Sequence, residues 1–424
     1  MKRDAIASAG LHPDVRRVLD GLATAEADLP DARVLPPEAY HSEAFHAFEK
    51  EAVFMHSWLC VGRVEQIAKP GDYLALTLAG EPILVVRDKQ GRVNAMSALC
   101  RHRGHPLKEK CSGHADRFTC PYHRWSYDLQ GQLIGAPHIV KRVPIDTLRA
   151  ESQLPALKTE LWHGFIFVNF DPAAEALAPT LSKLEPYFEG FPLQDMVLVE
   201  PRVQPYPVEW NWKILLENYI EPYHTEFVHP VIHDFAPSAG VQFDGWSDGD
   251  NAISRGVPFL QAGGGLTDKG WASPASFPVI ESLSPRQKGQ VAFCMLPPSM
   301  NLIFTPDMIC YGLIYPESAT TLSVGGGLFT FGGWLLPRSS AELPDFDARA
   351  ERMMEGSRQL GEQDTSVNVA MQTAKTSRFA PRGRLCQLEE TLSQFNKWLG
   401  RKYRAHAERL ASAQDKTLPS RQAA

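Results

Sequence analysis

The spacing of hydrophobic residues changes twice along the chain. Up to residue 58, apolar residues recur at helical spacing, which predicts helices at about 14–26 and 42–58. From residue 59 onward, short apolar runs alternate with turns, a pattern typical of β-strands. The clearest predicted strands cover residues 73–78, 82–87 and 164–170. We therefore expect a helical lead-in over residues 1–58 and a small all-β domain over residues 59–170.

Beyond residue 170, helical and strand-like segments are mixed. The predicted elements are a hinge with a helix (171–194), a strand (196–207), a helix (209–227), an irregular region (233–283), strands between 290 and 331, and two helices (about 343–375 and 388–412). This mixture predicts an α+β domain over residues 171–424, in which an antiparallel sheet wraps around long helices.

Length and composition suit two ordinary domains. A chain of 424 residues exceeds the usual size of one compact core. Its net charge of −6 comes without a basic block, which argues against a nucleic-acid partner. No apolar run reaches the about 18 residues that cross a membrane, so no membrane partner is expected. Residues 1–13 lack the apolar segment of a secretory leader.

Two thiolates and two imidazoles lie on short spacers in the β-rich region, as Cys100-x-His102 and Cys120-x-x-His123. A [2Fe–2S] cluster of Rieske type uses this set, because two His replace two Cys on one of its irons. A structural zinc site is the alternative, since it uses the same residue types at similar spacing. Each segment here contributes one Cys and one His, whereas zinc fingers place both Cys first. The flanking residues, 100–104 and 120–128, also resemble the two cluster-binding loops of Rieske proteins.

The other cysteines have no spacing partner, and seven is an odd number for a disulfide framework. They are interpreted as buried or surface thiols: Cys60, Cys111, Cys294, Cys310 and Cys386. This cysteine usage predicts a reduced, cytoplasmic location.

A second dense group of polar residues follows at 209–230. On a regular helix, Glu217, Glu221 and His224 would share one face. His229 lies five residues after His224, and two prolines disfavour a regular helix here. We expect a break or bulge that brings the two imidazoles to one metal. A mononuclear Fe(II) that activates O₂ takes two His and one carboxylate and keeps positions open.

The carboxylate must come from elsewhere in the chain. The first closing helix offers Glu362 and Asp364, with Gln372 about two turns further on. Positions two residues apart on a helix differ by about 200° around its axis, so only one of the two carboxylates can face the iron.

With both motifs in this order, the chain resembles the α (terminal oxygenase) subunit of Rieske non-haem iron oxygenases from about residue 58 to residue 398. The resemblance implies an all-β Rieske domain followed by an α+β catalytic domain of helix-grip type. It also implies the ligands: Cys100, His102, Cys120 and His123 for the cluster, and His224, His229 and Asp364 for Fe(II). Asp364 stands eight residues before Gln372, as the family's acidic ligand does before its Gln.

The resemblance also implies roles for three further positions. Glu221 matches the acidic residue, more often Asp, that bridges a cluster His of one subunit to an iron His of the next. Asn218 matches a position near the iron. Arg124 stands where many members have Gly, and its cation would tune the cluster potential or reductase docking, or is simply solvated.

The activity implied is a terminal oxygenase that uses O₂ to hydroxylate, dihydroxylate or oxidatively demethylate a small aromatic or N-methylated (quaternary ammonium) compound. No G-x-G-x-x-G follows a strand, so a separate NAD(P)H-dependent flavin reductase, with or without a ferredoxin, is expected to supply electrons. The family's assembly implies a head-to-tail homotrimer or an α₃β₃ complex. The alternatives are a Rieske electron-transfer protein with a non-catalytic second domain, and a zinc-stabilised binding module.

Residues 233–283 are expected to lie over the pocket entrance. They hold six acids against two bases, and aromatic residues are interleaved, among them Phe243, Trp246, Trp271 and Phe277. This composition suits either an aromatic cage for a quaternary ammonium group or an ordinary acidic loop. The glycine triplets 263–265 and 325–327 lack the context of a phosphate loop and are predicted to be turns.

Overall fold

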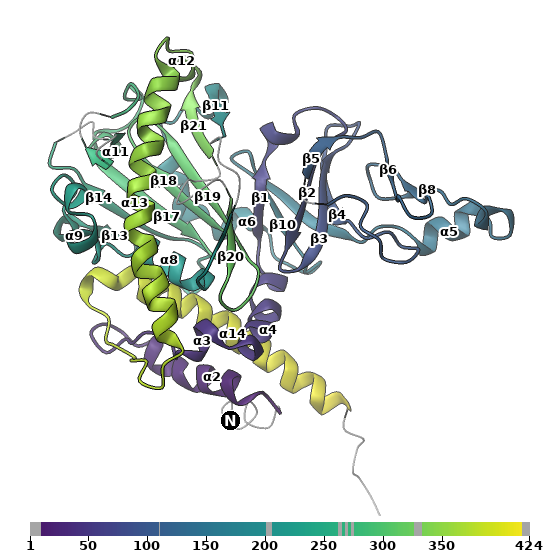
Figure 1. Cartoon of the computed structure of the whole chain (residues 1–424), viewed down its shortest axis with the longest axis horizontal. Helices are drawn as coiled ribbons and strands as arrows, with labels where there is room; N and C mark the ends of the chain where they lie inside the picture. Colours follow the sequence, from purple (N-terminus) through teal and green to yellow (C-terminus); the bar gives the residue numbers. More distant parts are fainter. Residues whose placement is uncertain are drawn as a thin grey trace, which may run out of the picture. The chain divides into compact units, whose positions relative to one another are not determined.

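The computed structural model describes residues 10–109, 111–200, 206–261, 265–267, 270–272, 275–325 and 333–417 (Figure 1). Contacts within it divide the chain into two compact units. We call Met55–Leu177 the β unit, and Met1–Phe54 together with Ala178–Ala424 the α+β unit. The three-part division predicted above, with limits at 58/59 and 170/171, stays a prediction.

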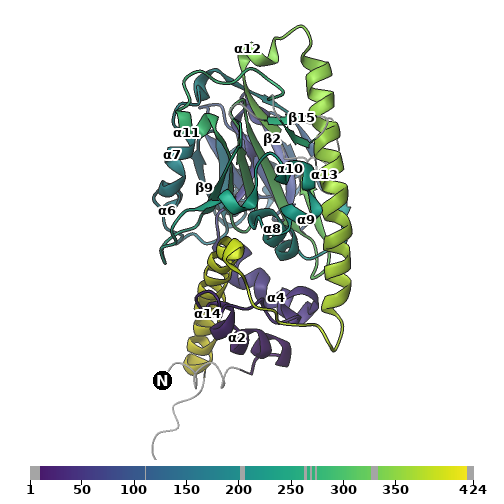
Figure 2. The ribbon, with the colours of Figure 1, turned by 90° about the vertical axis from the view of Figure 1, so that its left-hand side faces the viewer.

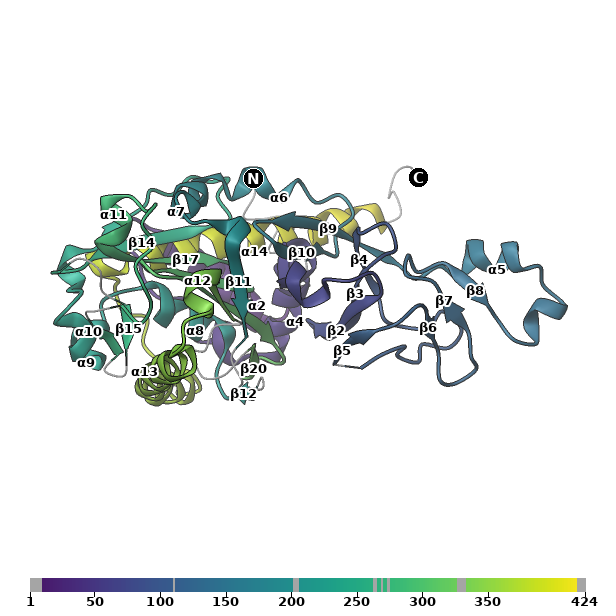
Figure 3. The same cartoon turned by 90° about the horizontal axis from the view of Figure 1, so that it is seen from above.

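The β unit is built on a seven-stranded sheet in the order β1-β10-β9-β4-β3-β2-β5, with every pair antiparallel. Its strands are β1 (Leu59–Arg63), β2 (Asp72–Leu78), β3 (Glu81–Arg87), β4 (Val93–Ser97), β5 (Cys111–His114), β9 (Ala156–Trp162) and β10 (Phe165–Asn169). A smaller sheet contains β6 (Phe118–Thr119), β7 (Ser126–Tyr127) and β8 (Leu133–Gly135). Helix α5 (Ile145–Glu151) packs on β8, as Figure 3 shows. The three strands predicted from the sequence are confirmed within a residue at each end.

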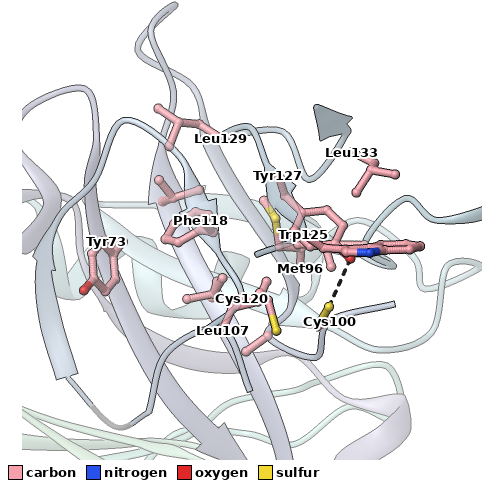
Figure 4. Close-up of a cluster of buried hydrophobic side chains, with 14 of the residues drawn as sticks. Tyr73, Met96, Cys100, Leu107, Phe118, Cys120, Trp125, Tyr127, Leu129 and Leu133 are labelled. Atoms are coloured by element: carbon pink, nitrogen blue, oxygen red, sulfur yellow. Dashed lines mark hydrogen bonds between the residues drawn. The ribbon is translucent and has the colours of Figure 1, made fainter. Parts of the chain in front are cut away.

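A core of buried side chains joins the two sheets of the β unit. Tyr73 and Phe118 meet edge to face, with ring centroids 5.4 Å apart, and Trp125, Tyr127 and Leu133 belong to the same cluster. Figure 4 shows the sulfur atoms of two cysteines at the margin of this cluster, below Trp125. The loops that carry the cysteines therefore rest on a packed apolar base.

Among the described residues, the main sheet of the α+β unit has nine antiparallel strands, which follow the order β11-β21-β19-β18-β17-β14-β13 with the pair β12–β20 beside β19. Its strands are β11 (Met196–Val199), β12 (Tyr206–Val208), β13 (Gln242–Phe243), β14 (Ile253–Pro258), β17 (Gln290–Leu296), β18 (Met300–Phe304), β19 (Ile309–Pro316), β20 (Leu322–Gly325) and β21 (Gly333–Pro337). A separate hairpin pairs β15 (Gly265–Thr267) with β16 (Gly270–Ala272). The expected α+β class with an antiparallel sheet is confirmed.

Three helices position the chemistry of this unit. Helix α8 (Trp212–Ile220) contacts β17 and β19 and also α13 (Phe346–Lys375), whose length is clear in Figure 2. Helix α14 (Glu390–Thr417) packs against α8 and against the N-terminal helices α2 (Pro13–Ala25) and α4 (Glu43–Ala52). The shorter helices are α3 (Glu38–His41), α6 (Leu177–Thr180), α7 (Glu185–Phe188), α9 (Thr225–Val228), α10 (Pro230–His233), α11 (Pro285–Lys288) and α12 (Arg338–Ala341). Within the described ranges, no helix is both long and apolar enough to cross a membrane.

Several predicted elements need correction. The single helix expected at 42–58 ends at Ala52 and is followed by a 3₁₀ turn, Phe54–His56. The helix expected at 209–227 ends at Ile220. The region 233–283 is not wholly irregular, because it contains β13 and β14. Of the glycine triplets, only Gly265 and Gly325 lie among the described residues, both in strands.

Candidate metal centres

Two loops of the β unit share one backbone pattern. In each, the cysteine N–H donates to the carbonyl five residues ahead, over 3.0 Å in residues 100–105 and 2.8 Å in residues 120–125. The N–H four residues after the cysteine donates back to the cysteine carbonyl, over 2.9 and 3.0 Å. At this fourth position φ is positive in both loops, 75° at Gly104 and 64° at Arg124. The loops are thus structural equivalents, and each presents one Cys and one His.

The four side chains pair by type. Cys100 and Cys120 are buried, with 3% and 2% of their surface exposed. Burial raises the pKa of the Cys100 thiol, and the nearby Cys120 thiol raises it further. The rings of His102 and His123 meet edge to face with centroids 4.7 Å apart. One pair of cysteines and one pair of histidines suit the two irons of a [2Fe–2S] cluster, because the cysteines bind one iron and the histidines bind the other.

The surroundings of these side chains also fit a cluster. The Nδ1 atom of His123 is buried and has no hydrogen-bond partner among the described residues, as expected of a nitrogen that binds a metal. His102 stacks on Trp125 at 4.9 Å. The Tyr127 hydroxyl lies 3.4 Å from Cys100 Sγ, the contact dashed in Figure 4, and it accepts the Arg101 N–H over 3.0 Å.

In the α+β unit, a second site begins where α8 stops. Glu221, which precedes a proline, takes an extended conformation (φ −94°, ψ 142°). The carbonyl of Ile220 accepts hydrogen bonds from Arg255 Nε (2.6 Å) and Thr391 Oγ1 (2.8 Å), so the helix end is satisfied inside the unit. Burial lowers the pKa of Arg255 to about 10. Beyond this break, the one-turn helix α9 has His224 as its N-cap and His229 as its C-cap.

The break brings three ligand residues together. The ligand atoms of His224, His229 and Asp364 lie within 4.8 Å of one another. Asp364 Oδ1 is 2.9 Å from His229 Nε2 and 3.7 Å from His224 Nε2. Of the two carboxylates left open by the sequence, Asp364 thus faces the imidazoles. Glu362 is 57% exposed and pairs with Arg358.

The Nδ1 atom of each imidazole forms a hydrogen bond with a residue outside the trio. His224 Nδ1 donates to Glu221 Oε1 over 2.5 Å, and His229 Nδ1 donates to Gln363 Oε1 over 2.6 Å. Both Nε2 atoms then point toward the carboxylate of Asp364, an arrangement that either a proton or a metal ion between them stabilises. Burial lowers the pKa of His229, but the hydrogen bond and charge of Asp364 outweigh it, so the pKa is raised overall.

Asn218 completes the group, since its Nδ2 donates to Asp364 Oδ1 over 3.2 Å. The helical face predicted for Glu217, Glu221 and His224 is wrong, because α8 ends before Glu221. Glu217 instead accepts a hydrogen bond from Tyr40 Oη over 2.6 Å, away from the trio.

Sequence reasoning missed three supporting groups. Gln363 and Arg255 are ordinary polar residues in their segments, and nothing in the sequence marked them. The third group, Lys213, could have been noticed in the sequence, because it lies in the apolar run of α8 and a buried lysine needs a charged partner. That partner is Glu49 of α4, at 2.8 Å, and neither side chain has any exposed surface.

Comparisons with known proteins cover both units. Residues 57–153 match the family described as Rieske [2Fe-2S] domain, and residues 193–405 match the family described as ring hydroxylating alpha subunit (catalytic domain). The chain is 33% identical over 208 residues to the carnitine monooxygenase oxygenase subunit of Acinetobacter pittii, covering 48% of this chain and 55% of the relative. It is 35% identical over 191 residues to the chlorobenzene dioxygenase subunit alpha of a Cupriavidus species, covering 44% and 42%. The chain thus spans about half the length of the curated relatives it matches.

A solved structure shares the fold. The naphthalene 1,2-dioxygenase of a Rhodococcus species, bound to indole, superposes with a TM-score of 0.75 at 18% identity. The superposition covers 92% of this chain and 98% of the other.

Proposed function

Because the chain belongs to the family of ring-hydroxylating oxygenase α subunits that carry a Rieske domain, we propose that it is the terminal oxygenase component of a Rieske non-haem iron oxygenase. Its cofactors are a Rieske [2Fe–2S] cluster and a mononuclear iron. The observation that supports the proposal best is the trio His224, His229 and Asp364, because a metal held by only three protein ligands would keep positions free for O₂.

Each ligand set has a distinct task in this proposal. Cys100 and Cys120 would hold one cluster iron, and His102 and His123 the other. When bound, the cluster stores one electron and the mononuclear iron binds and activates O₂. The protein's own contribution is orientation: Glu221 and Gln363 fix which nitrogen each imidazole turns to the iron. Asn218 holds the carboxylate of Asp364 in place.

The expected partners follow from this division. Electrons would come from a separate NAD(P)H-dependent flavin reductase, with or without a ferredoxin. The chain would assemble as a head-to-tail homotrimer or an α₃β₃ complex, in which Glu221 bridges to a cluster His of the neighbouring copy. We also expect a cytoplasmic location, which suits the buried thiols of Cys60, Cys294 and Cys310.

The substrate proposed is a small aromatic or N-methylated compound that is hydroxylated, dihydroxylated or oxidatively demethylated. The names of the relatives include both classes, carnitine and chlorobenzene. An aromatic cage in residues 233–283 gains no support from the described side chains. The ring of Trp246 already meets Lys183 and Arg401, each at 5.6 Å, and Phe277 packs in the apolar core. The side chain of Trp271 lies outside the described part.

The decisive experiment measures metal content and turnover together. The purified protein should show a Rieske absorption spectrum and mononuclear iron in addition to the cluster iron. With a surrogate reductase, a panel of carnitine, glycine betaine, chlorobenzene and naphthalene should reveal substrate-dependent O₂ uptake with product and little peroxide. A Rieske spectrum without additional iron would instead favour the electron-transfer protein, and tightly bound zinc without colour would favour the binding module.

A further inference from the structure

The two imidazoles of the iron site are held by groups of different charge. His224 donates its Nδ1–H to a carboxylate, Glu221, whereas His229 donates to a neutral amide, Gln363, over 2.6 Å. Gln363 is the residue directly before Asp364 on α13, and the side chains of consecutive helical residues point about 100° apart. Its side chain must therefore bend around the helix surface to reach the ring that Asp364 also contacts.

This contact would set the tautomer of His229 once a metal ion occupies the Nε2 side of the ring. A neutral imidazole carries one proton, and an acceptor at Nδ1 places that proton on Nδ1. Nε2 lies 2.9 Å from Asp364 Oδ1, and with the proton held at Nδ1 its lone pair would be free to bind a metal ion beside that carboxylate. Without the acceptor, the proton can move to Nε2 and the ring can rotate, and either change removes a metal ligand.

We propose that Gln363 is a positioning residue of the iron site, which fixes the tautomer and orientation of His229. The inference rests on the proposed function, because it takes His229 as an iron ligand. The neutral amide also limits the negative charge at the site. A carboxylate at residue 363 would add to those of Asp364 and Glu221 and would make His229 a stronger electron donor.

The position of Gln363 makes a clean test possible. Its side chain lies on the exposed face of α13, so replacing it opens no cavity in the core. Gln359, one turn earlier on the same exposed face, donates to Glu355 over 2.8 Å. Gln359→Leu and Gln359→Glu therefore control for the effect of each substitution on the helix.

The test is Co²⁺ binding to the full-length protein with its cluster intact and its mononuclear iron removed, followed by the visible absorption of the bound ion. Gln363→Leu should weaken Co²⁺ binding by about 10- to 100-fold, the usual effect of losing a partner of a metal-bound His. Gln363→Glu should bind Co²⁺ at least as tightly as the wild type and should lower the potential of the mononuclear iron. Both Gln359 variants should behave as the wild type.

Wild-type affinity in Gln363→Leu, or an equal loss in Gln359→Leu, would overturn the role of Gln363. His229→Ala separates this failure from that of the proposed function. If His229→Ala loses Co²⁺ and Gln363→Leu does not, the iron site stands and only the positioning role falls. If His229→Ala also binds normally, His229 is not a ligand and both proposals fall.

Discussion

At the scale of single residues, the iron site depends on which carboxylate faces the two imidazoles. Asp364 is buried beside His229, and Glu362 lies on the exposed side of the same helix in an ion pair with Arg358. An exposed ion pair contributes little to stability, about 0–1 kcal/mol. Positions 362 and 364 differ by about 200° around the helix axis, which explains why one carboxylate is buried and the other exposed. The spacing of the residues alone did not decide which of the two faces the imidazoles.

Asp364→Ala should therefore lose the mononuclear iron and all turnover while the Rieske spectrum stays unchanged. Glu362→Ala should keep both, because its carboxylate only pairs with Arg358. Iron analysis and O₂ uptake on the two purified variants check this, and the opposite pattern would exchange the roles of the two residues.

A second residue-scale prediction concerns Arg124, whose φ of 64° is one that residues other than glycine rarely adopt. Its counterpart in the first loop is Gly104, with φ of 75°. Arg124→Gly should therefore stabilise the β unit by about 1 kcal/mol, the typical cost of this conformation for a side chain. Arg124→Ala removes the same charge but keeps the strain, and should bring no gain. Denaturant unfolding followed by the Rieske absorption measures both, and equal stabilisation by both variants would point to charge as the cause.

At the scale of elements, α8 carries much of the site and is held at both ends. Its first turn is tied to α4, because Glu49 accepts from Lys213 Nζ (2.8 Å) and from Trp212 Nε1 (2.8 Å). Its last carbonyl is tied to β14 and α14 through Arg255 and Thr391. The helical pattern over residues 209–227 and the two prolines predicted a helix and a break near this place. They did not predict the break at Ile220, because the donors that satisfy it come from segments distant in the sequence.

The buried pair leads to a prediction at this scale. Lys213→Met leaves Glu49 as an unpaired charge in the core and should cost about 3–5 kcal/mol of unfolding free energy. Lys213→Met with Glu49→Gln removes both charges and should recover most of that loss. Urea unfolding of the three proteins tests the pair, and a double variant as unstable as the single one would mean that packing, and not charge, sets the cost.

At the scale of the whole molecule, the sequence predicted the cluster ligands and the two iron histidines because they lie on short spacers such as Cys100-x-His102. Asp364, 135 positions after His229, followed only from the resemblance to the family. The sequence predicted the α+β class because helical and strand patterns alternate after residue 170. Contacts between distant segments escaped it. The hydrogen bond from His229 to Gln363 joins residues 134 positions apart, and that from Lys213 to Glu49 joins residues 164 apart. Periodicity contains no information about such pairs, since each partner is chosen by the folded surroundings.

The last prediction links the two units through assembly. Glu221 Oε1 accepts from His224 Nδ1 within the chain, and the proposed bridge adds an imidazole N–H from a cluster His of the neighbouring copy. Glu221→Gln keeps the side chain's shape and one acceptor oxygen, so His224 should remain a ligand and metal content and oligomeric state should stay near those of the wild type. The amide lacks the charge that stabilises two imidazole donors at once, so electron transfer from cluster to iron should fall by orders of magnitude, with steady-state turnover falling alongside. Rapid mixing of the reduced cluster with substrate and O₂ measures that step directly, and His224→Ala serves as the control that loses iron. Near-normal transfer in Glu221→Gln would leave Glu221 as a residue that only orients His224.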